Sequence, residues 1–445
     1  MVQRNTEAIE YALKEARDND VKFIRLWFTD ILGNIKGFAV TVEELETVLT
    51  RGMGFDGSAI EGYARSDEKD LYALPDPNTF NILPWRPKTN AVAKMFCDIV
   101  TPDNEPFQGD PRTVLQKNLE IAAAMGYTYY VSPELEYFYF QSSSSTTGLD
   151  SSGYFDQSSN SQGTDLRRET VLTLEELGIP VESSHHEAAP SQHEIDLRHT
   201  DALTMADSVM TYKLVVKEIA MQHGFYASFM PKPVAEITGN GMHTHMSLFE
   251  GDKNVFYEEH DEAHLSQTAR HFSAGLMKHA REITLVTNQW VNSYKRLVPS
   301  YEAPTYVTWS DVNRSDLIRI PSFMPGREMS RRIEYRAPDP ACNPYLAFSV
   351  MLAAGLEGIK NKYKLPEASG RNVNDMSSEE RYSRGIEPLP SNLYEAIQIT
   401  EGSELVRKAL GDNVFQSFIE NKKIEWNRFS YEISRYEIER YLPLL

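Results

Sequence analysis

The sequence predicts an α+β protein with more than one domain. Apolar residues recur at helical spacing in several segments, as Ile9, Ala12, Leu13 and Ala16 do within residues 6–17. Other segments, among them residues 131–140, are short runs of aromatic and β-branched residues, which are typical of buried strands. The chain has 445 residues and a mass of 50.7 kDa, enough for a large core and more than one domain.

The first hundred residues are expected to form a small α+β unit. After the helix at 6–17, residues 21–28 and 35–40 resemble strands around a turn at Gly33-Asn34. Thr41 to Glu44 has the pattern of a capping box and predicts a second, short helix. A Gly-rich loop at 52–59, a Pro-rich run at 75–87 and a strand at 92–99 complete the unit, which ends at the turn-rich segment 101–109.

From Asp110 onward, strands alternate with long helices. Asp110-Pro111 is a strong helix start, with Asp as the N-cap and Pro in the first turn, and the helix should stop at Gly126. Further helices are expected at about 164–177, 201–223, 264–286 and 343–362, with a final helical region from about Ser403. The Ser-rich segment 142–163 is interpreted as a mobile surface loop.

Charge and cysteine content exclude several classes of function. The formal net charge is −19 and the isoelectric point is about 5.1, which argues against nucleic acid or an anionic membrane as a partner. Cys97 and Cys342 are too few for a disulfide framework, so a reducing compartment is expected. No signal peptide or membrane span is indicated, and a cytoplasmic location follows as the default expectation.

Four expected strand segments each carry a row of polar residues on one face. Residues i and i+2 of a strand point to the same side, so Glu134 and Glu136 should stand side by side. The same period aligns His243, His245 and Ser247 in one segment and Arg332, Glu334 and Arg336 in another. In residues 185–198, a turn at Ala189 to Ser191 should bring Glu187 and Glu194 near one another.

Together these faces offer Glu134, Glu136, Glu187, Glu194, His243 and Glu334 as metal ligands. Such oxygen-rich sets suit Mg²⁺ or Mn²⁺, and their number points to two ions and phosphoryl chemistry. Arg332, Arg336, Arg314 and Arg319 are the expected accompaniment, because guanidinium groups bind phosphate and carboxylate in a bidentate manner. Any single acid pair fits a structural ion pair equally well, but four such faces in one chain favour a functional site.

Several common catalytic motifs are absent from the sequence. There is no GxxxxGK[ST] segment, and Gly239-Asn240-Gly241 lacks the third glycine of a dinucleotide-binding fingerprint. HExxH and GxSxG are also missing. A nucleotide, if bound, is therefore held in another way.

An ordered set of motifs resembles the type I glutamine synthetase family and covers nearly the whole chain. The set comprises Pro133-Glu134-Leu135-Glu136, His185 to Glu187, Gln192 to Glu194, Gly241-Met242-His243, Lys295 to Leu297, Tyr301 to Pro304, Asn313-Arg314-Ser315 and Arg332 to Arg336. The resemblance implies a β-grasp-like N-terminal domain at 1–104. It also implies a catalytic domain at 105–445, with a curved antiparallel sheet flanked by helices. The implied activity joins ammonia to glutamate with ATP through γ-glutamyl phosphate.

The resemblance also implies roles for individual residues. Glu136, Glu187 and Glu194 match the ligands of one metal ion, and Glu134, His243 and Glu334 those of a second. Glu136, Gly239, Arg296 and Arg336 match the glutamate site, and Glu182, His245, Ser247, Arg314, Arg319 and Arg332 match the ATP site. Glu302 matches the base that deprotonates ammonium, and Asp56 the second half of the ammonium site. Taken alone, Asp56 in a Gly-rich turn would more often be a turn former.

Family membership further implies a dodecamer of two stacked hexameric rings, in which each site borrows Asp56 from a neighbouring subunit. The chain departs from the usual family pattern at Ala59 and Thr238, both near the glutamate or amine site. A subgroup that glutamylates larger amines or polyamines is similar in these loops, so the acceptor stays open between ammonium and another amine. Arg65 matches an arginine that senses glutamine, which makes product inhibition a hypothesis. A catalytically silent ring-forming scaffold is the remaining alternative.

Overall fold

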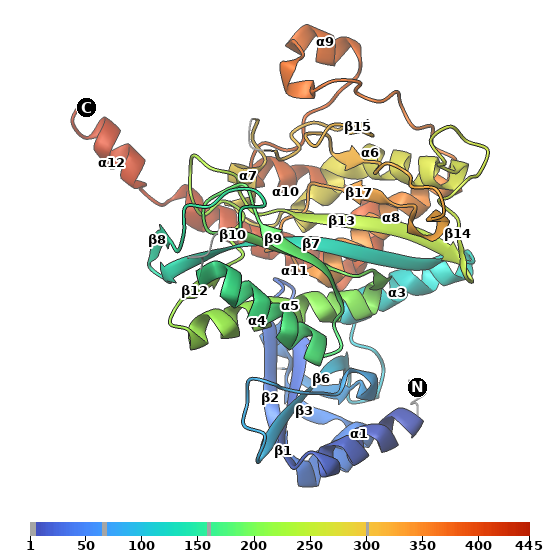
Figure 1. Ribbon diagram of the computed structural model, residues 1–445, viewed down its shortest axis with the longest axis vertical. Helices are drawn as coiled ribbons and strands as arrows, with labels where there is room; N and C mark the ends of the chain where they lie inside the picture. The colour runs from blue at the N-terminus through green and yellow to red at the C-terminus, as the bar shows by residue number, and fades with distance from the viewer. Residues whose placement is uncertain (1–5, 65–68, 158–161, 300–301) are drawn as a thin grey trace.

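The protein is described here from a computed structural model that covers residues 6–64, 69–157, 162–299 and 302–445. A small N-terminal sheet lies at one end of the molecule and a larger, curved sheet crosses the rest, with helices packed around it (Figure 1). The predicted α+β class, with a β-grasp-like domain and a curved catalytic sheet, is confirmed.

The N-terminal sheet has the strand order β2-β1-β6-β4-β3, and β5 pairs with β6. Strands β1 and β6 run parallel, whereas the other neighbouring strands are antiparallel. Its elements are α1 (Thr6–Asp18), β1 (Val21–Thr29), β2 (Ile35–Thr41), η1 (Val42–Glu44), α2 (Leu45–Arg51), β3 (Met53–Asp56), η2 (Gly57–Ile60), β4 (Asp70–Pro75), η3 (Pro77–Thr79), β5 (Asn81–Ile82) and β6 (Ala91–Val100).

The expected capping box at Thr41 is wrong in detail. The Thr41 side chain makes no cap hydrogen bond, and the segment after it is the 3-10 turn η1. Helix α2 begins only at Leu45, where Leu45, Val48 and Leu49 become buried. Burial of these apolar side chains determines where the helix begins, rather than the local polar pattern.

The large sheet has eleven strands, with the central order β15-β16-β17-β13-β7-β10-β9. Its strands are β7 (Thr128–Ser142), β8 (Ser145–Gly148), β9 (Val181–His186), β10 (Gln192–Leu197), β11 (Thr200–Asp201), β12 (Tyr226–Ser228), β13 (Met242–Glu250), β14 (Lys253–Asn254), β15 (Trp309–Ser310), β16 (Ile318–Arg319) and β17 (Ile333–Tyr335). The helical elements of this region are α3 (Pro111–Ala124), α4 (Gln162–Glu176), α5 (Ala202–Gln222), α6 (Gln267–Thr287), α7 (Ser293–Arg296), η4 (Glu328–Ser330), α8 (Pro344–Lys360), η5 (Val373–Asp375), α9 (Ser378–Ser383), α10 (Leu393–Glu401), α11 (Glu404–Ser430) and α12 (Arg435–Tyr441).

The long helices expected from the sequence are present near the expected bounds. Asp110 accepts hydrogen bonds from Arg112 N and Thr113 N, both at 3.2 Å, which confirms it as the N-cap of α3. The final helical region is divided, because Gly411 has a φ of 74° inside α11 and α12 is separate. Helix α8 is buried on most sides and packs against α3, α6 and α11.

The surface position expected for the Ser-rich segment 142–163 agrees with its mostly exposed residues, but part of the segment is ordered structure rather than a loop; residues 158–161 lie outside the described residues. Strand β8 pairs with β7, and the Asp150 side chain is only 8% exposed against the β9–β10 turn. The segment therefore contributes to the packed structure through contacts with residues distant in the sequence.

Polar contacts join the two sheets. Arg112, at the start of α3, binds Asp76 and Asp98 of the N-terminal part and also Asp207 of α5. Asn343 Nδ2 donates to Asp30 O at 3.0 Å, and Gln289 Nε2 donates to Leu32 O at 2.8 Å. No helix in the described part of the chain is long and apolar enough to cross a membrane.

Candidate active site between two acidic clusters

The first cluster of candidate ligands comes from three adjacent strands of the large sheet. In the register of β7, β13 and β17, His243 lies opposite Glu134 and His245 lies opposite Glu334. Glu134, His243 and Glu334 each offer a ligand atom, and these atoms lie within 4.8 Å of one another. His243 Nδ1 is 3.5 Å from a Glu134 oxygen and 3.9 Å from a Glu334 oxygen. We call this set the Glu334 cluster.

The second cluster lies at the β9–β10 hairpin. His185, Glu187 and Glu194 place their ligand atoms within 4.8 Å of one another, and we call them the Glu194 cluster. His185 Nε2 is 2.8 Å from Glu187 and 3.6 Å from Glu194. Strand pairing places Glu194 opposite both His185 of β9 and Glu136 of β7, as the turn at 189–191 predicts.

Glu136 links the two clusters. One of its oxygens lies 3.9 Å from His243 Nε2. The other accepts hydrogen bonds from Gly241 N at 2.9 Å and from Gln192 Nε2 at 3.0 Å. This carboxylate therefore has a fixed orientation between the Glu334 and Glu194 clusters.

Burial and mutual repulsion perturb these carboxyl groups strongly. Burial raises the pKa of Glu194 well above its usual range, and the charges of Asp196, Glu134 and Glu136 raise it further. Burial and the Glu187 charge raise the pKa of Glu136 to about 8. Both groups would ionise more readily beside a multivalent cation. The excess of close, buried oxygens thus fits a metal site.

The three members of the Glu334 cluster have the protonation state that a metal ligand needs. Burial opposes ionisation of Glu134, but His245 and His243 hold its pKa well below the usual value. Burial also opposes ionisation of Glu334, and Arg336 lowers its pKa. Burial and Arg336 lower the pKa of His243 to about 4, so its imidazole is neutral near pH 7. This donor set of hard oxygens and one imidazole suits Mg²⁺ or Mn²⁺.

Arginines line the same face. Arg336 and Arg319 both bind Glu334, and Arg319 Nε lies 2.5 Å from a Glu334 oxygen. Arg332 Nε donates to His245 Nδ1 at 3.0 Å, while His245 Nε2 lies 2.7 Å from Glu134. Three cationic side chains therefore meet the Glu334 cluster directly or through His245.

Arg314 and Glu302 lie at the exposed side of the site. Arg314 contacts the Tyr154 hydroxyl at 3.5 Å. Its pKa is raised by this hydrogen bond and also by the charges of Glu302 and Glu334, which places all three groups in one electrostatic neighbourhood. Glu302 is exposed and has a φ of 57°, an uncommon backbone conformation for a non-glycine residue.

The remaining predicted glutamate-site residues lie beside Glu136 in the same chain. Arg296 is 2% exposed and donates to the carbonyl oxygens of residues 336, 337 and 338 at 2.7–3.2 Å. Its charge acts on Glu136. Gly239 O accepts from Gln192 Nε2 at 3.1 Å, so Gly239 also adjoins the Glu136 carboxylate.

Asp56, Glu182 and Ser247 are three further predicted site residues, and each belongs to neither cluster. Asp56 lies at the end of β3 in the N-terminal sheet, where its carboxylate accepts from Ser58 N at 3.0 Å and Ser58 Oγ at 2.9 Å. Glu182 is exposed and is the extra residue at a register shift in β9. Ser247 lies on β13 opposite Tyr130, two positions beyond His245. Arg65 lies outside the described residues.

Two further residues of the site lie in the sequence motifs but were assigned no role from the sequence. His185 lies on the same strand face as Glu187, because the two are two positions apart, and this spacing was a usable signal. Gln192 donates to Glu136, Gly239 and Asn240. No motif marks such a contact, because it depends on three segments meeting in space.

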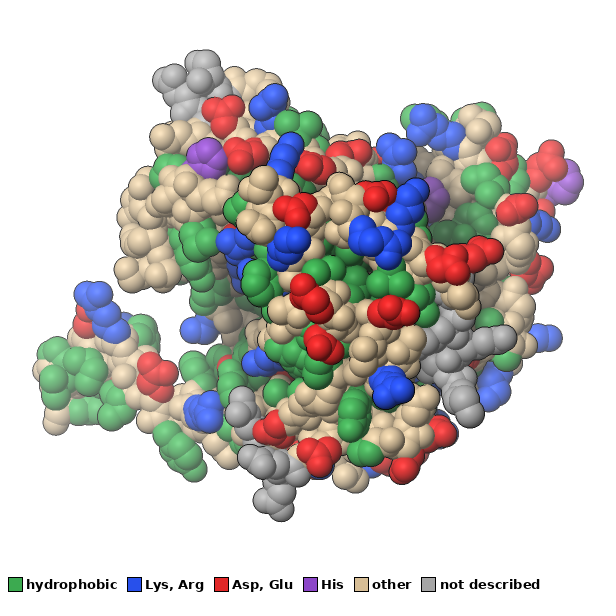
Figure 2. Space-filling view, turned by 90° about the horizontal axis from the view of Figure 1, so that it is seen from below, with side chains coloured by type: hydrophobic (Ala, Val, Ile, Leu, Met, Phe, Trp, Pro, Cys, Tyr) green, Lys and Arg blue, Asp and Glu red, His purple; other side chains and the backbone are tan. Residues whose placement is uncertain are grey.

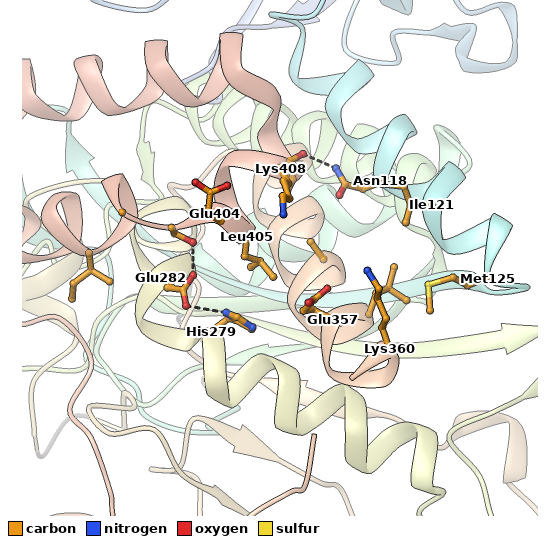
Figure 3. A pocket seen from close by; sticks show the side chains of 16 residues that line it. Asn118, Ile121, Met125, His279, Glu282, Glu357, Lys360, Glu404, Leu405 and Lys408 are labelled. Carbon is orange, nitrogen blue, oxygen red and sulfur yellow. Dashed lines mark hydrogen bonds and ion pairs between the residues drawn. The ribbon is translucent and has the colours of Figure 1, made fainter. Parts of the chain in front are cut away.

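A separate cavity of about 640 Å³ lies among α3, α6, α8 and α11 (Figure 3). Its wall includes Met125, Lys360, Leu405 and Lys408, and no residue of either acidic cluster lines it. This cavity is therefore separate from the candidate active site.

Two protein-family models match the chain. Residues 20–102 match the model of the glutamine synthetase β-grasp domain, and residues 108–441 match that of the glutamine synthetase catalytic domain. Proteins named glutamine synthetase from Mycobacterium bovis and Methanosarcina mazei are 48% and 50% identical to the chain. The first alignment covers 98% of this chain and 99% of the relative, and the second covers 98% of each.

Solved structures with the same fold include one titled as a GmaS/ADP complex. It has a TM-score of 0.87 and 31% identity, and the match covers 97% of this chain and 99% of that one. A second, titled as apo GmaS without ligand, has a TM-score of 0.85 and 32% identity.

Proposed function

The chain belongs to the glutamine synthetase family, and from this membership we infer that it joins ammonia to the γ-carboxylate of glutamate with ATP. In this reaction the γ-phosphoryl group of ATP passes to a glutamate oxygen, giving ADP and γ-glutamyl phosphate. The ammonia nitrogen then bonds to the carbonyl carbon of the acyl phosphate as phosphate leaves, and the nitrogen loses a proton to give the amide. Atoms therefore balance without a further co-reactant.

The convergence of Glu134, His243 and Glu334 carries the proposal for the site. These ligand atoms come from three different strands and meet within 4.8 Å. Random placement of solvated charges would not orient a partly buried glutamate, a fully buried glutamate and a neutral imidazole toward one point. This convergence also opposes a catalytically silent scaffold, which would have no need for it.

We assign Glu134, His243 and Glu334 to one divalent ion and Glu136, Glu187 and Glu194 to another. Mg²⁺ or Mn²⁺ held there would neutralise phosphate charge during transfer. His185 belongs with the second set, because its ligand atom lies within 4.8 Å of those of Glu187 and Glu194.

The positive side chains around the clusters have separate roles in the proposal. Arg336 and Arg296 would bind the glutamate carboxylates, together with the backbone at Gly239. Arg314, Arg319 and Arg332 would bind ATP phosphates, because guanidinium groups pair with phosphate oxygens. His245, Ser247 and Glu182 would complete the nucleotide site along β13 and β9.

For ammonium, Glu302 would accept a proton and so release ammonia as the nucleophile. Its exposed position beside Arg314 is compatible with a segment that contacts substrate. Asp56 would act from a neighbouring subunit, since within one chain it lies in the N-terminal sheet. Arg65 is retained as a proposed glutamine sensor.

An exposed apolar terminal helix supports the proposed homo-oligomer. Ile433, Tyr436 and Leu442 are 72%, 61% and 74% exposed in and beside α12. The helix projects from the body of the molecule, with hydrophobic side chains gathered on its surface (Figures 1 and 2). Such a segment is stabilised when another subunit covers it. We therefore retain the dodecamer of two hexameric rings.

The domain boundary and the cellular location complete the proposal. We place the boundary at residues 104/105, in the segment between β6 and α3. We also propose a cytoplasmic location. Cys97 and Cys342 are both buried and unbridged, which is compatible with a reducing compartment.

A γ-glutamyl-amine ligase is the second candidate, favoured by Ala59, Thr238 and the likeness to the GmaS structures. Thr238 Oγ1 donates to Gln192 Oε1 at 3.0 Å, and Gln192 in turn contacts Glu136, so Thr238 influences the acceptor side of the site. Phosphate release should be measured with ATP and glutamate plus ammonium, methylamine, putrescine or spermidine. We expect ammonium to give the highest kcat/KM. Release with another amine but little with ammonium would establish the second candidate instead.

A further inference from the structure

A third group of potential metal ligands lies behind the Glu194 cluster. Asp150, His186 and His193 also place ligand atoms within 4.8 Å of one another, and both histidines are almost completely buried. His186 and His193 are paired across β9 and β10, on the opposite strand face from His185 and Glu194. The two faces of one hairpin therefore carry two different polar clusters.

Hydrogen-bond chemistry shows that this rear cluster does not offer three free ligands. Arg167 Nη1 lies 2.6 Å from His193 Nδ1. A guanidinium group can only donate, so Nδ1 must accept and the proton of the neutral ring must be on Nε2. That N–H faces Asp150 Oδ2 at 3.8 Å, and a protonated nitrogen cannot bind a metal ion.

His186 is likewise fully engaged. Its Nδ1 lies 2.7 Å from the Glu187 carbonyl oxygen, and its Nε2 lies 2.9 Å from Asp150 Oδ1. Both neighbours are acceptors, so both ring nitrogens donate. His186 thus connects Asp150 directly to the backbone of Glu187, a proposed metal ligand.

Asp150 is also bound to the hairpin turn through Ser191. Asp150 Oδ1 accepts from Ser191 N at 3.0 Å. The Ser191 hydroxyl accepts from Leu149 N at 2.7 Å and Asp150 N at 2.9 Å, and it donates to Asp150 O at 3.1 Å. These bonds attach the segment after β8 to the turn that joins Glu187 to Glu194.

The first turn of α4 covers the cluster closely. A Cβ at Gly163 would lie 2.4 Å from His193 Nε2 and 3.4 Å from Asp150 Oδ2. A larger residue would displace the histidine, and little space remains for a metal ion with its ligands.

We propose that Asp150 is a positioning residue: through His186 and Ser191 it holds the β9–β10 hairpin so that Glu187 and Glu194 stand at metal-binding separation. The inference rests on the proposed function, because it concerns the metal ion assigned to that hairpin. It excludes Asp150, His186 and His193 as a third metal site.

Binding of Mn²⁺ without nucleotide, followed by the electron paramagnetic resonance of the free ion, tests this proposal directly. Loss of an outer-shell partner typically weakens metal affinity about 10- to 100-fold. We expect Asp150→Asn to weaken one class of Mn²⁺ site by about tenfold or more, with the number of sites unchanged. Asp156→Asn is the matched control, because Asp156 is an exposed acid of the same segment. It should bind Mn²⁺ as the parent does.

Steady-state kinetics distinguish positioning from simple loss of folded protein. Asp150→Asn should raise the Mn²⁺ concentration for half-maximal activity and leave the KM for glutamate nearly unchanged, and excess Mn²⁺ should restore much of kcat. A lower kcat that metal does not restore would indicate a merely structural role and overturn the proposal. If Asp150→Asn does not fold, Ser191→Ala removes only the hydroxyl bonds and should shift Mn²⁺ affinity in the same direction by a smaller factor.

Several outcomes of the Mn²⁺ titration would contradict the inference. Unchanged binding in the variants would overturn it, and so would the loss of one whole equivalent of metal, which would indicate a third metal site. A parent protein that bound no Mn²⁺ would refute the proposed metal sites and the positioning role together. A parent that bound Mn²⁺ but formed no amide would refute the proposed function alone.

Discussion

At the scale of single residues, the chain buries charges outside the acidic site as well as within it. Lys422 of α11 is fully buried, donates to Gln289 O at 3.1 Å and lies 4.2 Å from the centre of the Trp290 ring. Burial lowers the pKa of Lys422 to about 7, although Glu425 and Asp30 raise it. This lysine is therefore a probe of how burial couples to stability.

The sign of the pH dependence follows from this depressed pKa. Lys422 has a pKa near 10.5 in the unfolded chain and about 7 in the folded chain. As the pH falls from 10.5 toward 7, the unfolded chain takes up the proton first, so the free energy of unfolding decreases by up to about 1.4 kcal/mol per pH unit. Lys422→Met should therefore exceed the parent in Tm by a margin that grows between about pH 10 and pH 7 and is constant below pH 7.

Differential scanning fluorimetry across this pH range measures the margin. Lys423→Met is the control, because Lys423 is 49% exposed and pairs only with the exposed Glu401 in the described structure. Its effect on Tm should be small and nearly independent of pH. A Lys422→Met margin that is the same at pH 7 and pH 10 would refute the coupling.

At the scale of elements, the entry to β13 brings the glutamate side and the metal side of the site together. A Cβ on Gly241 would lie 2.7 Å from Arg296 Nη2 and 2.8 Å from His243 Nε2. Gly241→Ala should displace one or both side chains, and such misplacement lowers kcat/KM by about tenfold to a hundredfold. Steady-state kinetics, with circular dichroism to verify the fold, measure the effect.

Gly402→Ala is the matched control for this substitution. Gly402 caps α10 with a φ of −85°, and an added Cβ would lie 3.7 Å from Ile399 O, an ordinary contact. The control should retain parental activity. If Gly241→Ala were equally active, the close approach of Arg296 and His243 would not matter for catalysis.

Local sequence patterns were sufficient to predict which residues share a face of a strand. They were not sufficient to predict which strands pair with one another. Alternation correctly groups Glu134 with Glu136 and His243 with His245, because a strand has a period of two. The opposition of Glu334 to His245 depends on strands nearly ninety residues apart, and no local pattern indicated this pairing. The helix start at Asp110 was predictable because its cap is local.

The elements that differed from expectation are those determined by tertiary contacts. Thr41 has the cap pattern without the cap bond, and the Ser-rich segment is held by Ser191 and β7 rather than by its own composition. The register shift beside Glu182 is likewise invisible in a strictly alternating pattern. Composition alone does not report what a segment packs against.

At the scale of the whole molecule, α12 has no buried residue in the described structure of a single chain. Removing residues 431–445 should give a smaller assembly with fewer subunits. The truncation removes Ile433, Tyr436 and Leu442, and with them any contact that these residues make with another subunit. Sedimentation velocity measures this directly.

The control for this truncation keeps the apolar surface and changes only charge. Arg435 and Glu439 form an exposed pair, so Arg435→Gln with Glu439→Gln should leave the mass unchanged. A parent chain that sediments as a monomer, or a truncated chain of unchanged assembly size, would contradict the role of α12.

The central claim is that carboxylates from separate strands of one sheet hold two divalent ions beside the nucleotide phosphates. Anomalous diffraction from crystals grown with Mn²⁺ and ADP tests this claim most directly. One anomalous peak is expected among Glu134, His243 and Glu334, and a second beside Glu136, Glu187 and Glu194. No peak at either position, or a peak only among Asp150, His186 and His193, would contradict it.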